Sequence, residues 1–526
     1  MTMNAHRPLI RLDELLLCGR EDRPALTYQD ETLSYQQLRD QVAGVAAGLR
    51  DLGIRRGDRV LVYLEKRIET VVAMLAVSAA DGVLVPANPV SKPAQVAYVA
   101  ADCGARFVVT TTDRYAVLAS ELAASARPEH LILVAGTAAA DPGPGRWRCT
   151  SWAALRGTDT APVSASAIDT DLAAIFYTSG STGGPKGVVL SHRNLLAGAE
   201  SVASYLEHTG DDVVLGALPL SFDAGFSQLT TSLFAGAHLV LVNYLLPREI
   251  VRLCARHQVT ALTCVPPLWL QLAAQTWPVE STASLRYFAN TGGRMPRTTL
   301  DRLRSIFPAA KPYLMYGLTE AFRSTYLDPA QVDARPDSIG KAIPNADVLV
   351  LRPDGTQCES GEHGEIVHRG ALVALGYWNA PDLTAQRFRP IPRPGAGLLT
   401  ENAVWSGDVA YRDDEGFLYF VGRTDDLIKT SGYRVSPAEI EEVAYASGLV
   451  NEAVAFGVPD DRLGQHIVLV VTGECDVDVL RKTLQHELPR YLVPQRIVLL
   501  TQLPRSGNGK FDRVALRGQL AEGVPG

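Results

Sequence analysis

The sequence lacks the segments that would send a protein out of the cell or into a membrane. The start, MTMNAHRPLIRLDELLLCGRED, does not resemble a secretion signal, because Asp13 and Glu14 interrupt its short apolar run. The most apolar later run, VVAMLAVSAADGVLVPA, is broken by Asp81 and is too short to span a bilayer. We therefore expect a cytoplasmic protein with no membrane partner.

Paired cysteines and an excess of positive charge are also missing. The seven cysteines form no C-x-x-C pair and no zinc spacing with histidine, so we interpret them as buried, reduced side chains. The formal net charge of −7 argues against a general nucleic-acid-binding protein, since such proteins are basic. The 526 residues exceed the size at which one hydrophobic core stops growing, which predicts more than one domain.

Helix and strand patterns alternate through the first four-fifths of the chain. Ser34 and Gln37 have the spacing of a capping box and predict a helix that ends at Gly53. The runs DRVLVYLE and ARFVVTT are typical of short buried strands. Alternation of this kind indicates parallel sheets covered by helices. Two segments rich in proline and glycine, 135–152 and 389–400, are predicted to be loops.

The pattern changes twice in the last third of the chain. From about Val348 short strands separated by turns predict a small β-rich subdomain. Further on, Ser436, Pro437 and Glu439 predict the start of a new helix. We place a domain boundary between these two regions, at Arg423–Asp426.

The segment YTSGSTGGPKGVVLSHRNL, residues 177–195, combines glycines, hydroxyls and one lysine. Apolar runs on both sides predict a strand, a loop and a second strand, after which Ser191 caps a helix. Pro185 and Gly187 flank Lys186, so this is not a Walker A loop. Free backbone N–H groups and hydroxyls could surround a polyphosphate. A flexible surface turn is the alternative, since glycine clusters often form such turns.

This loop resembles the signature of the adenylate-forming superfamily, which comprises acyl-CoA synthetases, luciferases and the adenylation domains of nonribosomal peptide synthetases. Three more segments match in the expected order: YGLTEA (316–321), the run 406–443 and PRSGNGKFDR (504–513). The resemblance covers essentially the whole chain. It implies an α/β fold, with a large N-terminal domain (1–424) of two helix-covered sheet subdomains plus the small β-rich subdomain. A small, mobile α+β C-terminal domain (425–526) would follow.

The resemblance also implies the reaction and its cofactors, ATP and Mg²⁺. In this family a carboxylate joins to ATP, giving an acyl-adenylate and pyrophosphate, and a thiol then takes the acyl group. Glu320 would bind magnesium, Thr319 would contact the α-phosphate, and Tyr316 would lie against the adenine. The implied ATP-binding and AMP-binding residues are Thr178, Ser179, Gly180, Ser181, Thr182, Lys186, Gly292, Gly293, Tyr316, Gly317, Asp408, Arg423 and Arg434.

Lys510 is the catalytic residue that the resemblance singles out, together with Thr319 and Glu320. Its ammonium would bridge the attacking carboxylate and the α-phosphate. Because the thiol must later arrive where Lys510 stood, the family rotates its C-terminal domain. Asp425 matches the hinge position, and Gly432 matches the glycine beside the pantetheine tunnel.

The segment LPLSFDAGFSQL (218–229) carries the most information about the acid. Asp223 lies in an apolar stretch, where a carboxylate is costly without a cation. It resembles the aspartate of amino-acid adenylation domains, which pairs with the substrate ammonium. Two alternatives remain open: Asp223 caps a helix or faces solvent, or it serves a CoA ligase, since some of those also carry an aspartate here.

With YGLTEAFRSTYL, this segment looks like the freestanding enzymes that load β-amino acids onto carrier proteins for macrolactam polyketides. Leu220, Phe226, Leu318 and Phe322 would line the side-chain pocket, and Arg323 could instead bind a second carboxylate of the substrate. The function we predict is therefore adenylation of an amino acid and its transfer to an acyl carrier protein. The alternatives are an acyl- or aryl-CoA ligase and a catalytically silent ATP-binding protein.

Overall fold

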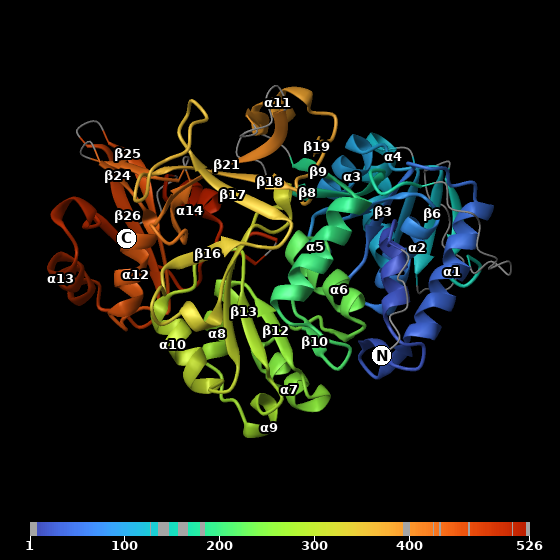
Figure 1. Cartoon of the computed structure of the whole chain (residues 1–526), viewed down its shortest axis with the longest axis horizontal. Coiled ribbons are helices and arrows are strands. Elements are labelled where there is room, and N and C mark those ends of the chain that lie inside the picture. The colour runs from blue at the N-terminus through green and yellow to red at the C-terminus, as the bar shows by residue number, and fades with distance from the viewer. Residues whose placement is uncertain are drawn as a thin grey trace.

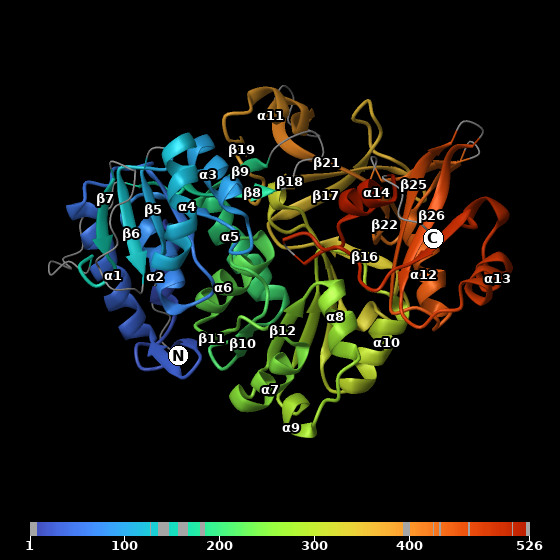
Figure 2. The same cartoon turned by 180° about the vertical axis from the view of Figure 1, so that it is seen from behind.

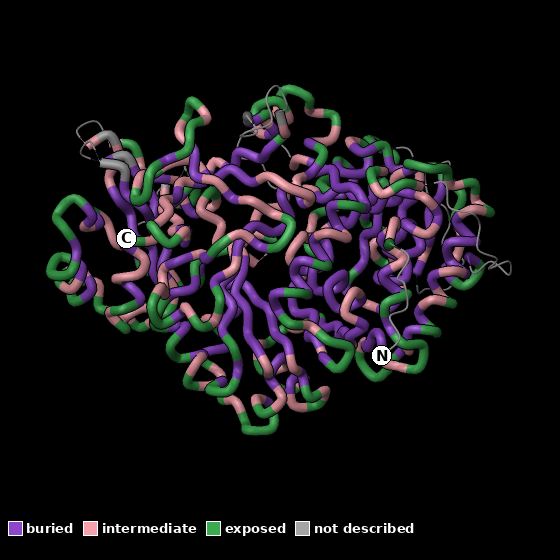
Figure 3. The backbone as a smooth tube through the Cα atoms, in the orientation of Figure 1, coloured by how far each residue is buried: buried purple, intermediate pink, exposed green. Residues whose placement is uncertain are grey.

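The computed structural model describes residues 8–126, 128–134, 147–155, 167–178, 185–392, 400–423, 426–430, 433–460, 463–507 and 509–521. Helices cover sheets through the large N-terminal part, and a smaller sheet with its own helices forms the C-terminal part (Figure 1). Buried residues follow the strands through the interior, whereas exposed residues gather on loops and outer helix faces (Figure 3). The expected α/β fold class is confirmed.

The first sheet has the order β19-β9-β8-β4-β3-β5-β6-β7. Most neighbours are parallel, but β9 is antiparallel to both β8 and β19. The strands are β3 (Arg59–Tyr63), β4 (Val83–Pro86), β5 (Phe107–Thr111), β6 (His130–Val134), β7 (Arg148–Ser151), β8 (Leu172–Thr178), β9 (Lys186–Ser191) and β19 (Gly376–Tyr377). Strands on both sides of the glycine-rich loop are thus confirmed. Strand β7 corrects the prediction of a continuous loop over 135–152, because pairing with β6 gives its backbone N–H and C=O groups partners.

The second sheet is parallel in its first half. Strands β10 (Val213–Gly216), β11 (His238–Leu241), β12 (Ala261–Cys264), β13 (Tyr287–Asn290) and β14 (Lys311–Tyr316) run parallel, and β1 (Pro24–Tyr28) joins β11. Strand β2 (Glu31–Ser34) is antiparallel to β1. The carboxyl ends of these parallel strands meet at one edge, which is where ligands bind in open α/β sheets.

The β-rich region continues this second sheet instead of standing apart from it. Strands β15 (Thr325–Leu327) and β16 (Ser338–Ala342) join it to β17 (Ala346–Leu351), β18 (Gly364–Gly370), β20 (Phe388–Pro392), β21 (Thr400–Arg412) and β22 (Leu418–Arg423). All of these neighbours are antiparallel. Strand β20 corrects the loop predicted for 389–400. Its two prolines are tolerated because β20 pairs with β21 alone, as an edge strand does.

The helices follow the predicted pattern. The N-terminal part contains η1 (Leu12–Cys18), α1 (Tyr35–Asp51), α2 (Ile68–Ala79), α3 (Pro93–Asp102), α4 (Thr112–Ser125), α5 (His192–Tyr205), α6 (Asp223–Ala235), α7 (Pro247–His257), α8 (Pro266–Ala273), α9 (Val279–Thr282), α10 (Arg297–Ile306), η2 (Thr319–Ala321), η3 (Pro329–Gln331) and α11 (Pro381–Arg387). The capping box of Ser34 and Gln37 and the N-cap at Ser191 are confirmed. No described helix is long and apolar enough to cross a membrane.

The C-terminal part is a compact α+β unit. It contains β23 (Ile428–Thr430), β24 (Tyr433–Val435), α12 (Pro437–Ala446), β25 (Glu452–Asp460), β26 (Gly464–Thr472), α13 (Val477–Glu487), η4 (Arg490–Leu492), β27 (Arg496–Leu499) and α14 (Arg513–Ala521). Helix α12 begins where predicted, although Ser436 makes no side-chain cap bond. The backbone N–H of Arg297 in α10 donates to Glu442 in α12 at 3.0 Å, which joins the two parts.

Four of the cysteines are buried as expected, but the interpretation is wrong for the others. Cys18 and Cys149 are exposed, and Cys475 is half-buried. All seven are free thiols. Exposed thiols of this kind are compatible with the reduced state that the sequence indicated.

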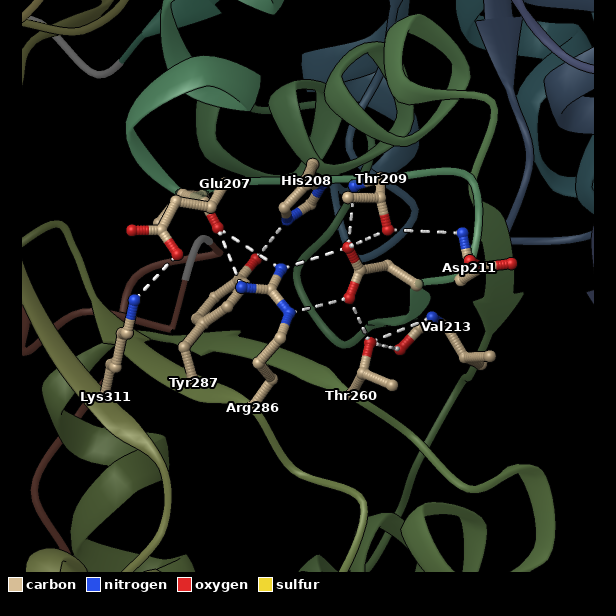
Figure 4. Close-up of polar contacts among 11 residues, drawn as sticks. Glu207, His208, Thr209, Asp211, Val213, Thr260, Arg286, Tyr287 and Lys311 are labelled. Carbon is tan, nitrogen blue, oxygen red and sulfur yellow. Dashed lines mark hydrogen bonds and ion pairs between the residues drawn. The ribbon is translucent and has the colours of Figure 1, made fainter.

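A buried ion pair fixes the amino edge of the second sheet, opposite to the ligand-binding edge. Asp212 accepts hydrogen bonds from Arg286 at 3.0 Å and from Thr260 at 2.7 Å (Figure 4). Arg286 also donates to the carbonyl of Leu206 at the end of α5. Burial by itself raises the pKa of Asp212, but the bonds from Arg286 and Thr260 outweigh it and hold the pKa below its usual value.

We predict that Asp212→Ala lowers the free energy of unfolding by about 3 kcal/mol, because it leaves Arg286 without its partner. The low end of the range for such pairs applies, since Arg286 is partly exposed. A carboxylate with a lowered pKa stabilises the fold above the usual aspartate pKa and loses this effect as the pH falls through its folded value. The difference in the free energy of unfolding between Asp212→Ala and the parent protein should therefore be smaller at acidic pH.

Urea unfolding at pH 7 and at pH 3 measures both effects. Asp333→Ala is the matched control, because Asp333 pairs with Arg304 at the exposed surface and should change stability by less than about 1 kcal/mol. Equal losses in the two variants would contradict the importance of the buried pair.

Candidate functional site

A tyrosine and an aspartate meet at the carboxyl edge of the second sheet. Tyr316 is the last residue of β14, and its hydroxyl donates to Asp408 Oδ2 at 2.5 Å. Asp408 lies in β21 and is buried, with Arg423 of β22 3.7 Å from its Oδ1. The antiparallel pairing of Asp408 with Arg423 brings these two groups together.

Asp408 keeps one oxygen available. Its Oδ1 is buried and accepts no hydrogen bond from the described residues. Burial raises the pKa of Asp408, while Arg423 and Tyr316 oppose that rise. A buried acceptor without a donor is costly, so this atom suits a ligand that brings hydroxyl donors, as the ribose of ATP does.

Glu320 is held by a tyrosine from a different sheet. Tyr377 of β19 donates its hydroxyl to Glu320 Oε1 at 2.6 Å. The ring of the same tyrosine lies under the ammonium of Lys186, 5.8 Å from the ring centroid. Tyr377 thus joins the lysine of the glycine-rich loop to the carboxylate of YGLTEA.

The residues around Glu320 fit a magnesium ion bound with a nucleotide. Magnesium is usually held by one or two carboxylates together with phosphate oxygens, and Glu320 is such a carboxylate beside the cation Lys186. When bound, the ion would neutralise phosphate charge. No cluster of three or more potential metal ligands occurs among the described residues.

Lys510 lies at the turn of a short hairpin. The N–H of Ser506 donates to the carbonyl of Lys510 at 2.8 Å, and the N–H of Gly509 donates to Ser506 at 2.9 Å. The side chain of Asn88, which follows β4, donates to the carbonyl of Gly507 at 2.9 Å. In Figure 2 a red loop of the C-terminal part accordingly extends toward the middle of the molecule.

The side chain of Lys510 lies against Gly292. Gly292 has a φ of 76°, and a Cβ at this position would lie 2.9 Å from Cε of Lys510. Surrounding protein lowers the pKa of Lys510, and Asp223 and Asp408 oppose this effect. The residue is exposed to solvent. Lysine and both aspartates therefore share one cleft.

Asp223 is already paired within the protein. Its Oδ2 accepts from Arg323 at 3.1 Å, and its Oδ1 has a longer contact of 3.4 Å with the hydroxyl of Thr319. Arg323 is 2% exposed, and its Nε has no partner among the described residues. Because Arg323 supplies a cation, the burial of Asp223 does not by itself require a cation from the substrate, and its contact with a substrate ammonium stays a prediction.

The four predicted pocket residues differ in position. Phe226 and Phe322 are fully buried and Leu220 nearly so, whereas Leu318 is half-buried. Phe322 has a φ of 56° and packs against Gly198 of α5, where a Cβ would come within 2.6 Å of its ring. Leu318 is thus the member of this group that keeps surface toward solvent.

Several predicted residues cannot be assigned a contact. Ser179, Gly180, Ser181, Thr182, Asp425 and Gly432 lie outside the described residues, as does the side chain of Arg434. Thr178 ends β8, where it pairs with Lys186 of β9. Gly293 lies against Pro266, and Gly317 lies against Arg323. Their proposed contacts with ATP stay predictions.

Sequence reasoning missed two residues at this site, Tyr377 and Asn88. Tyr377 stands in the short run GYW, and Asn88 stands in PANP. Neither run has a residue pattern that indicates catalysis. Pairing of β19 with β9, which places Tyr377 beside Lys186, appears only in the folded chain.

The fold and the site are those of an AMP-binding enzyme. Comparison with known proteins supports this class: residues 18–378 match the AMP-binding enzymes, and residues 439–510 match the C-terminal domain of AMP-binding enzymes. The chain belongs to this family of the adenylate-forming superfamily.

Relatives include two kinds of enzyme. A delta-poly-L-ornithine synthetase of Acinetobacter baumannii is 32% identical over 94% of this chain, which spans 35% of that protein. The 4-coumarate–CoA ligase 5 of Oryza sativa subsp. japonica is 30% identical over 97% of this chain and 94% of its own length. A solved structure of o-succinylbenzoate CoA synthetase from Bacillus subtilis, with ATP and magnesium, matches with a TM-score of 0.80 and 26% identity over 98% of this chain and 99% of that one.

We predict that Tyr377→Phe weakens the binding of magnesium and ATP about tenfold, because a hydrogen bond to a charged group contributes about 1.5 kcal/mol. Titration of the protein with Mn²⁺ in the presence of ATP, followed by electron paramagnetic resonance, measures this without turnover. Tyr419→Phe is the control, since Tyr419 donates to Asp413 at 3.0 Å away from the cleft. Unchanged Mn²⁺ affinity in Tyr377→Phe would contradict the role of this hydroxyl.

We predict that Lys510→Ala slows acid-dependent pyrophosphate exchange by roughly 100- to 1000-fold, the usual loss when one preorganised donor is removed. Lys482→Ala serves as the control, because Lys482 is an exposed lysine of α13 in the same C-terminal part. Exchange that survived in Lys510→Ala would remove Lys510 from the reaction.

Proposed function

We propose that the acid is an amino acid, of the β class, and that the acceptor is the phosphopantetheine thiol of an acyl carrier protein. The amino acid carboxylate would attack the α-phosphate of ATP, giving an aminoacyl-adenylate and pyrophosphate. The thiol sulfur would then displace AMP to form a thioester. A cytoplasmic location would suit both ATP and a carrier protein.

The observation that carries this proposal is the position of Asp223 Oδ1. This oxygen lies 3.4 Å from Thr319 Oγ1, close to where the resemblance places the α-phosphate, and Asp223 also influences Lys510. A carboxylate has about four acceptor positions, so Arg323 on Oδ2 leaves room for an ammonium on Oδ1. An amine on the β carbon of the acid would then lie next to the reacting carboxylate.

Arg323 favours an amine over a second carboxylate. Its side chain is buried, and Nη1 already donates to Asp223 and to the carbonyl of Phe322. An acidic group of the substrate would share the charge of this cation with Asp223, although Nε of Arg323 has no partner among the described residues. The preference for the β class rests on the resemblance of SFDAGFSQL and YGLTEAFRSTYL to the β-amino acid enzymes. The ornithine in the name of one relative supports an amino acid in general.

A second candidate, an acyl- or aryl-CoA ligase, is supported by the rice 4-coumarate–CoA ligase 5, which is 30% identical over 97% of this chain. The chain spans about a third of the length of the ornithine synthetase. In such a ligase the Asp223–Arg323 pair would be part of the pocket floor with no ammonium bound to it.

Pyrophosphate exchange with 3-aminobutanoate, β-alanine, aspartate, phenylalanine, hexanoate and benzoate separates the acids. Product analysis with CoA and with a phosphopantetheinylated carrier protein then separates the acceptors. Activity with hexanoate or benzoate and with none of the amino acids would reject the proposal in favour of a CoA ligase.

We predict that Asp223→Asn lowers kcat/KM for 3-aminobutanoate by roughly 100-fold, because the ammonium loses its charged partner. Butanoate, which lacks the amine, should lose much less. Arg323→Met is the matched variant: it breaks the same ion pair but keeps the carboxylate, so it should preserve the preference for the amine. An unchanged ratio of the two acids in Asp223→Asn would contradict amine binding.

A further inference from the structure

Lys66 is a buried lysine that the reaction described above does not use. It follows β3 in the first sheet and is 7% exposed. Its ammonium donates to three successive backbone carbonyls, those of Gly216 and Ala217 at 2.8 Å each and that of Leu218 at 3.3 Å. Gly216 ends β10 in the second sheet and the other two residues follow it, so one cation joins the two sheets.

No carboxylate compensates this charge among the described residues. The neighbouring Glu65 pairs with Arg114, and Arg67 pairs with Glu69. The titratable group that influences Lys66 is the thiol of Cys264 on β12, and burial raises the pKa of that thiol well above its usual value. Three carbonyl dipoles are therefore what holds the ammonium in place.

The backbone of Lys66 is fixed as well. Its N–H donates to Asn243 Oδ1 at 3.2 Å, and Asn243 Nδ2 donates back to its carbonyl at 2.7 Å. On the other side of the loop, Gln228 of α6 accepts from the N–H of Leu218 at 3.2 Å and donates to the carbonyl of Leu215 at 3.1 Å. The loop is thus held between Lys66 and Gln228.

This loop leads directly to the acid site. Leu218 is followed by Pro219, Leu220, Ser221, Phe222 and Asp223, and Asp223 begins α6. The loop packs closely against the first turn of α6, since a Cβ on Gly225 would lie 2.0 Å from the carbonyl oxygen of Pro219. A shift of the carbonyls at 216–218 must therefore move Leu220 and Asp223.

We propose that Lys66 is a positioning residue for acid selection: its ammonium clamps the carbonyls of 216–218 and so sets the place of Asp223. This inference rests on the proposed function, because it takes Asp223 as the acid-binding residue. Burial lowers the pKa of Lys66 to about 7. The ammonium of Lys66 is therefore mostly charged at pH 6 and mostly neutral at pH 8.5, where Cys264 remains a thiol.

Lys66→Met tests the proposal, because methionine keeps the length and removes both the charge and the donors. Hydrogen–deuterium exchange should accelerate in the amides of 216–223, and KM for 3-aminobutanoate should rise about tenfold at pH 6 while KM for ATP changes less than twofold. At pH 8.5 the difference in KM between variant and parent should shrink. Lys311→Met is the control, since Lys311 pairs with Glu207 on the opposite edge of the sheet.

Two results for Lys66→Met would overturn the proposal. One is unchanged hydrogen–deuterium exchange in the amides of 216–223, and the other is an equal rise of KM for 3-aminobutanoate and KM for ATP. Should Lys66→Met fail to fold, Asn243→Ala is the second test. This variant removes the two hydrogen bonds to the backbone of Lys66 and retains the Lys66 ammonium. Faster hydrogen–deuterium exchange in the amides of 216–223 is again expected. If pyrophosphate exchange shows that hexanoate is a substrate and that none of the amino acids is, the proposed function is rejected. The clamp is then tested with hexanoate and by the exchange measurement, which needs no substrate.

Discussion

The ammonium of Lys510 reaches the cleft because residue 292 has no side chain. Gly292 lies two residues after the end of β13 and has a φ of 76°. A Cβ at this position would lie 2.9 Å from Cε of Lys510. The hairpin that carries Lys510 is also tied to the first sheet through Asn88. Three parts of the chain therefore meet at one point: the edge of each large sheet and the C-terminal unit. Asp223, Asp408, Arg323 and Arg423 are the charged groups that influence Lys510 there.

The charges of the site come from both parts of the chain. Arg323 and Asp223 form a buried pair, and Asp408 is held by Tyr316 and Arg423. These groups belong to the N-terminal part and are positioned by its strands. Lys510 lies on a hairpin of the C-terminal part, which Asn88 of the N-terminal part holds through the carbonyl of Gly507. A rotation of the C-terminal part, which the family resemblance predicts, would break this contact and withdraw the Lys510 ammonium from the site.

The sequence predicted the chemistry of the site better than its contacts. The strands on both sides of the glycine-rich loop and the caps at Ser34 and Ser191 follow from local patterns, and the structure confirms them. The partners of the charged groups are distant along the chain: Tyr377 lies 57 residues from Glu320, and Arg323 lies 100 residues from Asp223. No periodicity or local motif reports such pairs.

The continuation of the second sheet into the β-rich region was missed for a related physical reason. Short antiparallel strands have the same alternation whether they form a sheet of their own or extend another one. What decides is the pairing of β16 with β15 on one side and β22 on the other. Because Tyr316 ends β14 and Asp408 lies in β21, this continuity also sets the distance between them. The feature that local patterns could not show is thus the one that assembles the nucleotide side of the site.

The pairing of Asp223 with Arg323 changes what can select an amine. Without substrate the pair is neutral, so an ammonium gains little from relieving an isolated charge. The selection must come from the geometry of Oδ1, which has one long contact with Thr319. A group that bonds to this oxygen gains about 1–3 kcal/mol over one that cannot, which is the range for hydrogen bonds to charged groups. Such a gain depends on the position of Asp223 to within a fraction of an ångström, and this is why the loop that leads to it must be rigid.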